Sequence, residues 1–577
     1  MYLRTVRTGN HEYLRLVEAY WEDGRSKQRV VLNLGRTDVL APHLGALVRR
    51  LGGEQAGGLV SAAAIAPRQA ACWGPFLVAR TLWRALGLEA ILDGCEGPKR
   101  RGARLADRAL VLVGNRLCDP ASEHGMADWL ESDFVCDRSG RRIAPRWKQR
   151  GRVRVDLGWL QRWYRTLDEL IAHKAHIEAE LFARLRDLFA LDAEMVFYDL
   201  TSTYFEGAGA APLARHGYSR DGRPRHRQVL VGLVMINGWP IAHHVFRGNR
   251  HDSATLEVVL DDIERRFGLK RVVVVGDRGM VTSDNLERIK RRGQGYLVGL
   301  QRRRREDVSA LIARARGPWQ DCPPGIAAGA KAAPPATRVQ EVPTDRPGVR
   351  VFVVHSDERQ AFEQARRENA MAHTRAALEG LARRVAQGRL KAPEKIGAAA
   401  ARILARHHGQ RYYDWELRAG TFRFFEHPVH LPREIALEGK YVIQTEEPHL
   451  SPVQAVTAYK ELAEVERGFR ELKDVIEMRP IYHRTAARVQ AHIFVAALAF
   501  LLDRALEKRL KANGVSLSAA QALKALRTVH VVDLDLGTTQ KRGTTTGSAN
   551  ARRVLAALKI ADREPPTPPK ERPKTAT

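Results

Sequence analysis

The 577-residue sequence has few cysteines, and they are not arranged to form a cross-link or a metal site. There are five, an odd number, scattered along the chain, and none belongs to a CxxC pair. This excludes a disulfide framework and a zinc ribbon, and it is typical of a protein from a reducing cytoplasm. The cysteines are Cys72, Cys95, Cys118, Cys136 and Cys322.

Long hydrophobic segments are also lacking. The first ten residues, MYLRTVRTGN, do not contain the apolar core of a signal peptide. The longest apolar run, IFVAALAFLL at 493–502, is too short to span a bilayer and predicts a buried helix. We therefore expect a cytoplasmic protein with no membrane partner.

Acidic residues are scarce relative to basic ones. Lys and Arg number 95 against 66 Asp and Glu, which gives a formal net charge of +29 and a pI near 10.3. So large a positive charge predicts a polyanionic partner, most commonly nucleic acid. A basic protein associated with ribosomes or membranes is the alternative that charge alone leaves open.

The length predicts several domains, and the pattern of the sequence changes along the chain. We expect an N-terminal β-hairpin region, then a mostly helical domain that either binds DNA ends or serves as a packing platform. An α/β core follows in two parts, interrupted by an α+β insertion, and a helical region and a Pro-rich disordered tail end the chain. The expected boundaries are 1–40, 41–190, 191–300 (first part of the core), 301–448 (insertion), 449–510 (second part of the core), 511–560 and 561–577.

The first part of the core reads as β-β-β-α-β-α-β, which predicts a mixed five-stranded sheet covered by helices, as in an RNase H-like fold. Asp199 ends the first strand and Asp277 the fourth, and these strands are neighbours in such a sheet. Carboxylates held that close repel each other unless a cation lies between them, and oxygen ligands suit Mg²⁺ or Mn²⁺. Either aspartate alone is more typical of a turn after a strand; the pair in this order favours a metal site.

The segment YKELAEVERGFRELKD at 459–474 predicts an amphipathic helix. At about 100° per residue, an apolar stripe forms along one side, and the opposite side predicts a solvated face. Glu466 borders the apolar stripe, so it should point at the sheet edge that bears the two aspartates. An ion pair of Glu466 with Arg470 on a wet surface is the alternative. The stripe consists of Leu462, Val465, Phe469, Leu472 and Ile476, and the solvated face of Lys460, Glu464, Arg467, Glu471 and Asp474.

In this order and with an insertion before the glutamate, Asp199, Asp277 and Glu466 resemble the acidic triad of the DDE transposases of bacterial insertion sequences. Further similar segments include DLTSTYFEG, HGYSRDGRPRHRQVLVGL, VFRGNRHDSATL and VVVVGDRGM. The early segment VEAYWEDGRSKQRVVLNLGR resembles the N-terminal hairpin of one long branch of this group.

The helix at 459–474 also resembles the signature of the insertion-sequence-four family, in which Tyr, Arg, Glu and Lys follow one another at fixed spacing. Tyr459, Glu466 and Lys473 match this signature in register. Leu462 stands at the position of the arginine, and it is the one departure.

The resemblance implies a transposase that binds the terminal inverted repeats of its own element, cleaves the DNA at the element ends and joins the 3′-OH ends to target DNA. Asp199, Asp277 and Glu466 would be the catalytic residues and would hold two Mg²⁺ ions about 3.5–4 Å apart, which Mn²⁺ can replace. Tyr459 and Lys473 would contact DNA. Further DNA contacts are expected from basic residues near the aspartate of the fourth strand and on or after the helix: Arg278, Arg470, Arg479, Arg484 and Arg488.

The family also implies a homodimer on double-stranded DNA, at the nucleoid of a bacterial cytoplasm. Two alternatives differ in chemistry. One is a catalytically silent or domesticated DNA-binding protein, and the other is an RNase H-like nuclease that cleaves DNA of particular structure without joining it.

Overall fold

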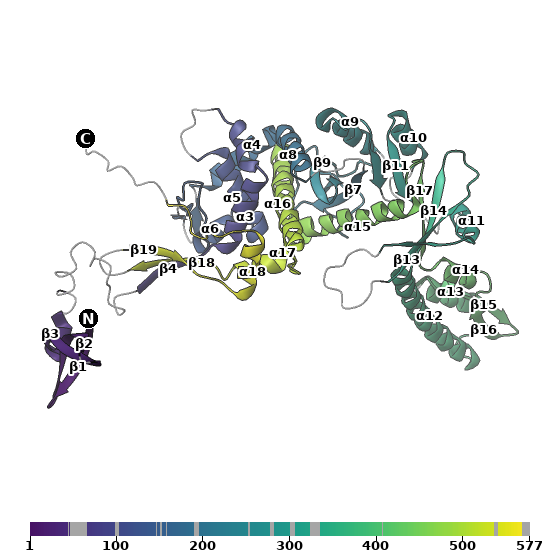
Figure 1. The fold of residues 1–577 in the computed structure, drawn as a ribbon. Helices are drawn as coiled ribbons and strands as arrows, with labels where there is room; N and C mark the ends of the chain where they lie inside the picture. Colours follow the sequence, from purple (N-terminus) through teal and green to yellow (C-terminus); the bar gives the residue numbers. More distant parts are fainter. Residues whose placement is uncertain are drawn as a thin grey trace. The chain divides into compact units, whose positions relative to one another are not determined.

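The computed structural model divides the chain into two compact units, Met1–Ala71 with Val531–Thr545, and Cys72–His530 with Thr546–Thr577 (Figure 1). It describes residues 1–22, 24–43, 46, 66–97, 103–145, 147–150, 153–156, 158–189, 195–251, 254–276, 282–300, 306–323, 335–406, 408–535 and 540–567.

The first unit consists of two small sheets and the short helix α1 (Thr37–Leu40). One sheet has the order β1 (Tyr2–Thr8), β2 (His11–Glu22) and β3 (Arg25–Arg36), so the expected hairpin, β2–β3, is confirmed and a third strand joins it. The other sheet has the order β19 (Gln540–Thr544), β18 (His530–Asp535) and β4 (Ala66–Cys72). The region 511–560, expected to be helical, contains the helices α17 (Ala519–Leu526) and α18 (Ala549–Ala557), but the β-branched run around Val531 forms the strand β18 between them.

The N-terminal part of the second unit is mostly helical, as the sequence predicts. Its tryptophans form a core, since Trp73, Trp83, Trp129 and Trp163 are fully buried. The helices are α3 (Gly74–Ala85), α4 (Leu88–Gly94), α5 (Leu105–Cys118), α6 (Met126–Ser132), α7 (Leu160–Ala172) and α8 (Lys174–Phe189), with a small hairpin of β5 (Trp147–Arg150) and β6 (Val153–Asp156).

Helices α3, α5 and α7 pack around the long apolar helix α16 (Ala486–Ala512). By length and composition α16 could cross a membrane, but 89% of its most apolar window is buried inside the protein. The buried helix expected at 493–502 is therefore present as the middle of a longer one. None of the five cysteines is paired in a disulfide, in agreement with the sequence prediction.

A mixed sheet of nine strands forms the centre of the second unit. Its order is β12-β13-β14-β17-β11-β10-β7-β8-β9. The expected five strands are β7 (Met195–Tyr204), β8 (Gln228–Ile236), β9 (Trp239–Arg247), β10 (Val273–Gly276) and β11 (Gly295–Gly299). The other four come from the predicted insertion: β12 (Gln320–Cys322), β13 (Thr337–Val342), β14 (Arg350–Ser356) and β17 (Lys440–Thr445). The prediction of a five-stranded sheet is corrected, because β17 pairs with β11 and adds the strands of the insertion to the same sheet.

The first and fourth strands are neighbours, as predicted. β10 runs parallel to β7, and Val275 pairs with Phe197. The strand β7 does not end at Asp199, however. β7 continues to Tyr204 because the following residues, TSTY, favour a strand, and this extension pairs with β8.

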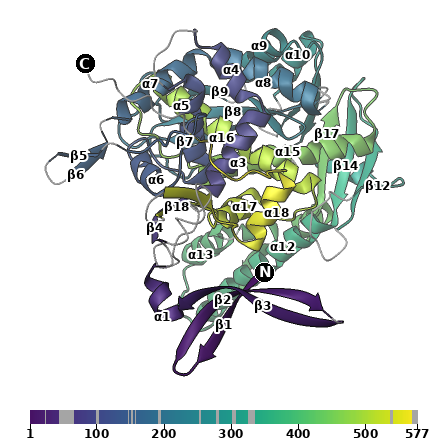
Figure 2. The same ribbon diagram turned by 60° about the vertical axis from the view of Figure 1, so that its left-hand side comes forward.

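Helices cover both faces of the sheet. On one face, α8, α9 (Leu256–Phe267) and α10 (Ser283–Arg291) enclose a core that includes Val196, Tyr198 and Leu200 of β7. Because side chains alternate along a strand, Asp199 and Thr201 belong to the other face. There α15 (Pro452–Asp474) crosses the strands from β7 towards β12, and α16 packs beside β9 (Figure 1, Figure 2).

The rest of the insertion lies beyond β14, apart from α11 (Glu306–Arg314), which packs on β17. Helices α12 (Asp357–Ala386), α13 (Pro393–Arg406) and α14 (His430–Leu437) form a separate small core with the hairpin of β15 (Tyr413–Arg418) and β16 (Thr421–Glu426).

Candidate active site

Helix α15 is fixed at its start and along one side. Ser451 and Gln454 form a capping box, and Pro452 occupies the first turn, where its missing N–H costs nothing. The predicted apolar stripe is confirmed, because all five of its members are at most 5% exposed. This burial sets the rotation of the helix about its axis, and thereby sets where Glu466 lies.

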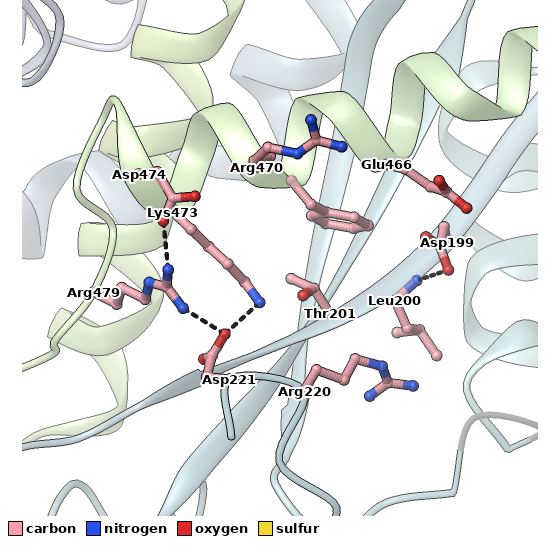
Figure 3. A pocket seen from close by; sticks show the side chains of 11 residues that line it. Asp199, Leu200, Thr201, Arg220, Asp221, Glu466, Arg470, Lys473, Asp474 and Arg479 are labelled. Atoms are coloured by element: carbon pink, nitrogen blue, oxygen red, sulfur yellow. Dashed lines mark hydrogen bonds and ion pairs between the residues drawn. The ribbon is translucent and has the colours of Figure 1, made fainter. Parts of the chain in front are cut away.

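A pocket of about 410 Å³ opens between α15, β7 and the loop that joins β7 to β8 (residues 205–227, the β7–β8 loop) (Figure 3). Four of its lining side chains are acidic and four are basic, so their formal charges cancel. The acidic ones are Asp199, Asp221, Glu466 and Asp474, the basic ones are Arg220, Arg470, Lys473 and Arg479, and Leu200, Thr201 and Phe469 complete the lining.

Asp199 and Glu466 lie at one end of this pocket, and their carboxylates come from the sheet and the helix respectively (Figure 3). Asp199 is half-buried, and its Oδ1 accepts a hydrogen bond from the backbone N–H of Leu200 at 2.7 Å. Glu466 is exposed. The two carboxylates that the sequence places on distant segments are thus brought to one site, and oxygen donors of this kind suit a hard divalent cation.

Two predicted basic residues lie at the other end of the pocket and share one carboxylate. Lys473 Nζ and Arg479 Nη1 each donate to Asp221 Oδ1 at 2.7 Å (Figure 3). Arg479 also forms an ion pair with Asp474. Burial lowers the pKa of Lys473, and the hydrogen bond and negative charge of Asp221 act in the opposite direction.

Spacing along α15 explains why Glu466, Arg470 and Lys473 line the same pocket. They are separated by four and three residues, so they project from one side of the helix. Arg470 is exposed, and Figure 3 draws it on the same side of the pocket as Glu466.

Tyr459 and Leu462, at the tyrosine and arginine positions of the signature, lie outside the pocket lining. The half-buried Tyr459 packs against Tyr441 and reaches Gly299 of β11 so closely that a methyl group at Gly299 would lie 2.1 Å from the tyrosine Oη. Leu462 is 4% exposed and belongs to the apolar stripe. Neither lines the pocket.

Two basic residues after the helix also lie outside the pocket lining. Arg488 forms two hydrogen bonds of 2.9 Å with Asp168 of α7, and its guanidinium stacks 4.8 Å from the ring of Tyr164. Arg484 is exposed. Asp277 and Arg278 fall outside the described residues, and they follow Gly276, the last residue of β10, in the sequence.

The opposite side of α15 is not the solvated face that the sequence predicts. Arg467 hydrogen-bonds Glu471 at 2.7 Å and pairs with Glu507 of α16, and Arg504 of α16 reaches Glu464 at 2.7 Å. Lys460 donates to Thr337 at 2.8 Å. Four of the five residues are half-buried, because the charged second half of α16 and the insertion lie against them, and only Asp474 is exposed as predicted. The 3.6-residue period of a helix carries no information about a partner helix.

Sequence reasoning missed Arg220 and Asp221. They lie in the segment GYSRDGRPRH of the β7–β8 loop, where Asp-Gly predicts only a turn. The one available signal is the concentration of basic residues around a single aspartate, and it does not specify which helix the loop meets.

Comparison with known proteins bears on the same segments. A family model described as "Transposase DDE domain" matches residues 192–502, which is more than half of the chain, and one described as "IS1634 family transposase, N-terminal domain" matches residues 3–62. Among solved structures, a piggyBac transposase synaptic complex with hairpin DNA is similar over 79% of each chain, with a TM-score of 0.33 and 9% identity. A TM-score and an identity this low do not support an argument about this chain. The comparison with curated proteins gives no match.

Proposed function

Because the chain belongs to the transposase DDE domain family, we propose that it mobilises its own insertion sequence. In this proposal it binds the terminal inverted repeats, cleaves the DNA at the element ends and joins the 3′-OH ends to target DNA, acting as a homodimer. The observation that supports it best is the meeting of Asp199 and Glu466 in one pocket, since they come from opposite ends of the matched segment.

The residues of the pocket fit divalent cations. Asp199 and Glu466 offer oxygen ligands only, and an open, polar pocket leaves room for water ligands, which Mg²⁺ retains. Asp277 is the proposed third carboxylate: Val275 and Phe197, which pair across β10 and β7, each stand two positions before one of the two aspartates in the sequence. When bound, two Mg²⁺ or Mn²⁺ ions would activate the attacking hydroxyl and neutralise charge on the leaving oxygen.

The charges of the pocket indicate that its basic residues bind DNA phosphates only after cations have bound. Without cations, the four acidic side chains of the pocket offset the four basic ones, so the pocket attracts a DNA phosphate only weakly. Once cations neutralise Asp199 and Glu466, Arg470 and the remaining N–H donors of Lys473 can bind phosphate oxygens beside the reacting bond. Phosphoryl transfer depends on this kind of positioning and charge neutralisation more than on covalent help from the protein.

We further place the chain in the long branch of the insertion-sequence-four family, on the register of Tyr459, Glu466 and Lys473. Two of these three residues line the pocket, and the N-terminal match to the IS1634 family model accords with the long branch. Since Leu462 is buried, the phosphate contact that the family's arginine makes is assigned to Arg470.

The test is cleavage of a duplex that carries the element's own end, taken from the DNA flanking the gene, in the presence of Mg²⁺. We expect the wild-type protein to cut this DNA and to join the cut end to a second duplex. Glu466→Gln should cut at least about 100-fold more slowly, since it removes one proposed metal ligand. Glu461→Gln is the matched control, because it makes the same change on the same helix outside the pocket lining.

Three results would contradict the proposal in different ways. A folded Glu466→Gln protein that cuts like wild type would remove Glu466 from the site. Binding of the ends without cleavage in either Mg²⁺ or Mn²⁺ would favour a silent DNA-binding protein. Cleavage without joining would favour a nuclease.

A further inference from the structure

The backbone of the β7–β8 loop is fastened to the sheet independently of its charged side chains. Gln228 donates from Nε2 to the carbonyls of Tyr218, at 2.9 Å, and of Gly248, at 3.0 Å. The backbone N–H of Arg220 donates to the buried Ser202 Oγ at 3.0 Å. The loop therefore delivers Asp221 to the pocket without needing the Asp221 carboxylate to hold it there.

The Asp221 carboxylate is buried between two cations. Its side chain is 3% exposed, against 10% for Lys473 and 27% for Arg479. One oxygen, Oδ1, accepts from both cations, whereas Oδ2 is buried without a hydrogen-bond partner among the described residues. Burying a charge in this way is costly, and the loop's own anchors do not require it.

The shared oxygen determines where the two cations lie. Their nitrogens are each 2.7 Å from the same atom, so two like charges are held close together, which without the carboxylate would be unfavourable. A lysine has three N–H donors and an arginine has five; Asp221 takes one from each, and Asp474 takes one more from Arg479. Donors therefore remain for another anion.

Arg479 is fixed from the other side as well. The chain after α15 returns to the end of β7. There the backbone N–H of Ile481 donates to the carbonyl of Tyr204 at 3.0 Å, and the backbone N–H of Glu206 donates to the carbonyl of Ile481 at 3.1 Å. Lys473 is fixed by the helix. Asp221 thus joins three separately anchored segments at one point of the pocket.

We propose that Asp221 is a positioning residue, which holds Lys473 and Arg479 as a pair so that their remaining donors bind a phosphate of the strand being cut, beside Asp199 and Glu466. The inference rests on the proposed function, because it assumes that DNA enters this pocket. It assigns to Asp221 no contact with the metal ions or with the reacting atoms.

Charge alone would predict the opposite effect of removing this carboxylate. Asp221→Asn makes the pocket more positive by one charge, and a purely electrostatic site would then bind DNA more tightly. If Asp221 positions the cations, the KM of the variant for element-end DNA should be within about twofold of wild type, because Lys473 and Arg479 keep their charges. Its kcat for end cleavage should fall about 10- to 100-fold, since small misplacements in a reacting site have effects of this size.

The decisive measurement combines this variant with Lys473→Gln. If Asp221 acts through Lys473 and Arg479, adding Asp221→Asn to Lys473→Gln should slow cleavage by a smaller factor than adding it to the wild type, because residues that act as a unit are not additive. Asp533→Asn, which breaks the pair of Asp533 with Arg542 in the β18–β19 hairpin, is the control and should cleave like wild type.

Several results would overturn the inference. They are a folded Asp221→Asn protein with wild-type kcat, a rise in KM as large as the fall in kcat, or losses that multiply in the double variant. A lowered unfolding midpoint that accounts for the lost activity would make the role structural. Glu466→Gln distinguishes failure of the positioning role from failure of the proposed active site. If Glu466→Gln is inactive while Asp221→Asn cuts like wild type, only the positioning role fails. If Glu466→Gln cuts normally, the proposed active site fails.

Discussion

At the scale of single residues, Leu462 limits how α15 can contact DNA. Its side chain is 4% exposed, and it belongs to the stripe that packs on the sheet. A long cationic side chain at this position would have to carry its charge into the apolar layer. The helix therefore presents its pocket-side arginine one turn after Glu466, at Arg470.

We predict that Leu462→Arg does not restore a phosphate contact and instead destabilises the protein by about 3 kcal/mol or more, because it buries an unpaired charge. The free energy of unfolding in urea measures this. Ala463→Arg is the matched control, since Ala463 is exposed on the next position of the same helix, and it should change stability by less than about 0.5 kcal/mol. Equal midpoints for the two variants would show that α15 packs differently.

At the scale of elements, the crossing of α15 and α16 depends on a glycine. A methyl group at Gly468 would lie 2.7 Å from Cζ of the buried Phe500 of α16, closer than side chains approach. The absence of a side chain at Gly468 thus allows the close approach of the two helices, whose charged side chains then form the Arg467 and Arg504 ion pairs.

We predict that Gly468→Ala lowers the free energy of unfolding by about 1–3 kcal/mol through overpacking, despite the better helix propensity of alanine. Gly380→Ala, in the middle of α12 with nothing within 4 Å of the new methyl group, should raise stability by up to about 1 kcal/mol. Thermal unfolding of both variants checks the pair. A stabilised Gly468→Ala protein would contradict the close crossing.

Sequence reasoning succeeded for elements where the information is local. The 3.6-residue period of α15 predicts both its buried stripe and the location of Glu466, and the strand order predicts that β7 and β10 are neighbours. It failed where the partner is distant along the chain. The residues KYVIQT at 440–445 are typical of a strand, but they do not indicate that Leu297 pairs with Thr445, and this pairing is what merges the insertion with the core sheet.

The same limit explains the missed part of the candidate site. Asp221 has no periodic context, and its significance comes from Lys473 and Arg479, which lie more than 250 positions away. The carboxylate on the strand could be recognised because it follows a run of apolar residues. A carboxylate in a loop has no such signal.

At the scale of the whole molecule, stability depends on histidines that are buried in the neutral form. Burial lowers the pKa of His243 to about 4, and that of His244 and His492 to about 3. In the unfolded chain each would titrate near 6.5. Below pH 6.5 the unfolded state therefore binds protons that the folded state does not, so stability is lost as the pH falls.

We predict that the free energy of unfolding decreases steadily between pH 6.5 and pH 4, by about 3 kcal/mol for His243 alone. Urea unfolding midpoints at several pH values measure the slope. His243→Gln should make the slope shallower, whereas His373→Gln, at an exposed position of α12, should leave it unchanged. An unchanged slope in His243→Gln would mean that His243 is already charged in the folded protein.

The strands β14 and β17 show how a protein of this kind can change its size without rebuilding its centre. His355 pairs with Lys440, and the backbone N–H of Ser356 donates to the carbonyl of Gly439 at 2.9 Å, so the chain leaves and re-enters the sheet at adjacent points. Most of the segment between them packs in the separate core of α12, α13 and the β15–β16 hairpin, so its length can change while the strands that flank β10 and β7 keep their register. Differences in DNA recognition between proteins of this kind can therefore arise in the segment between β14 and β17 while the residues of the pocket stay the same.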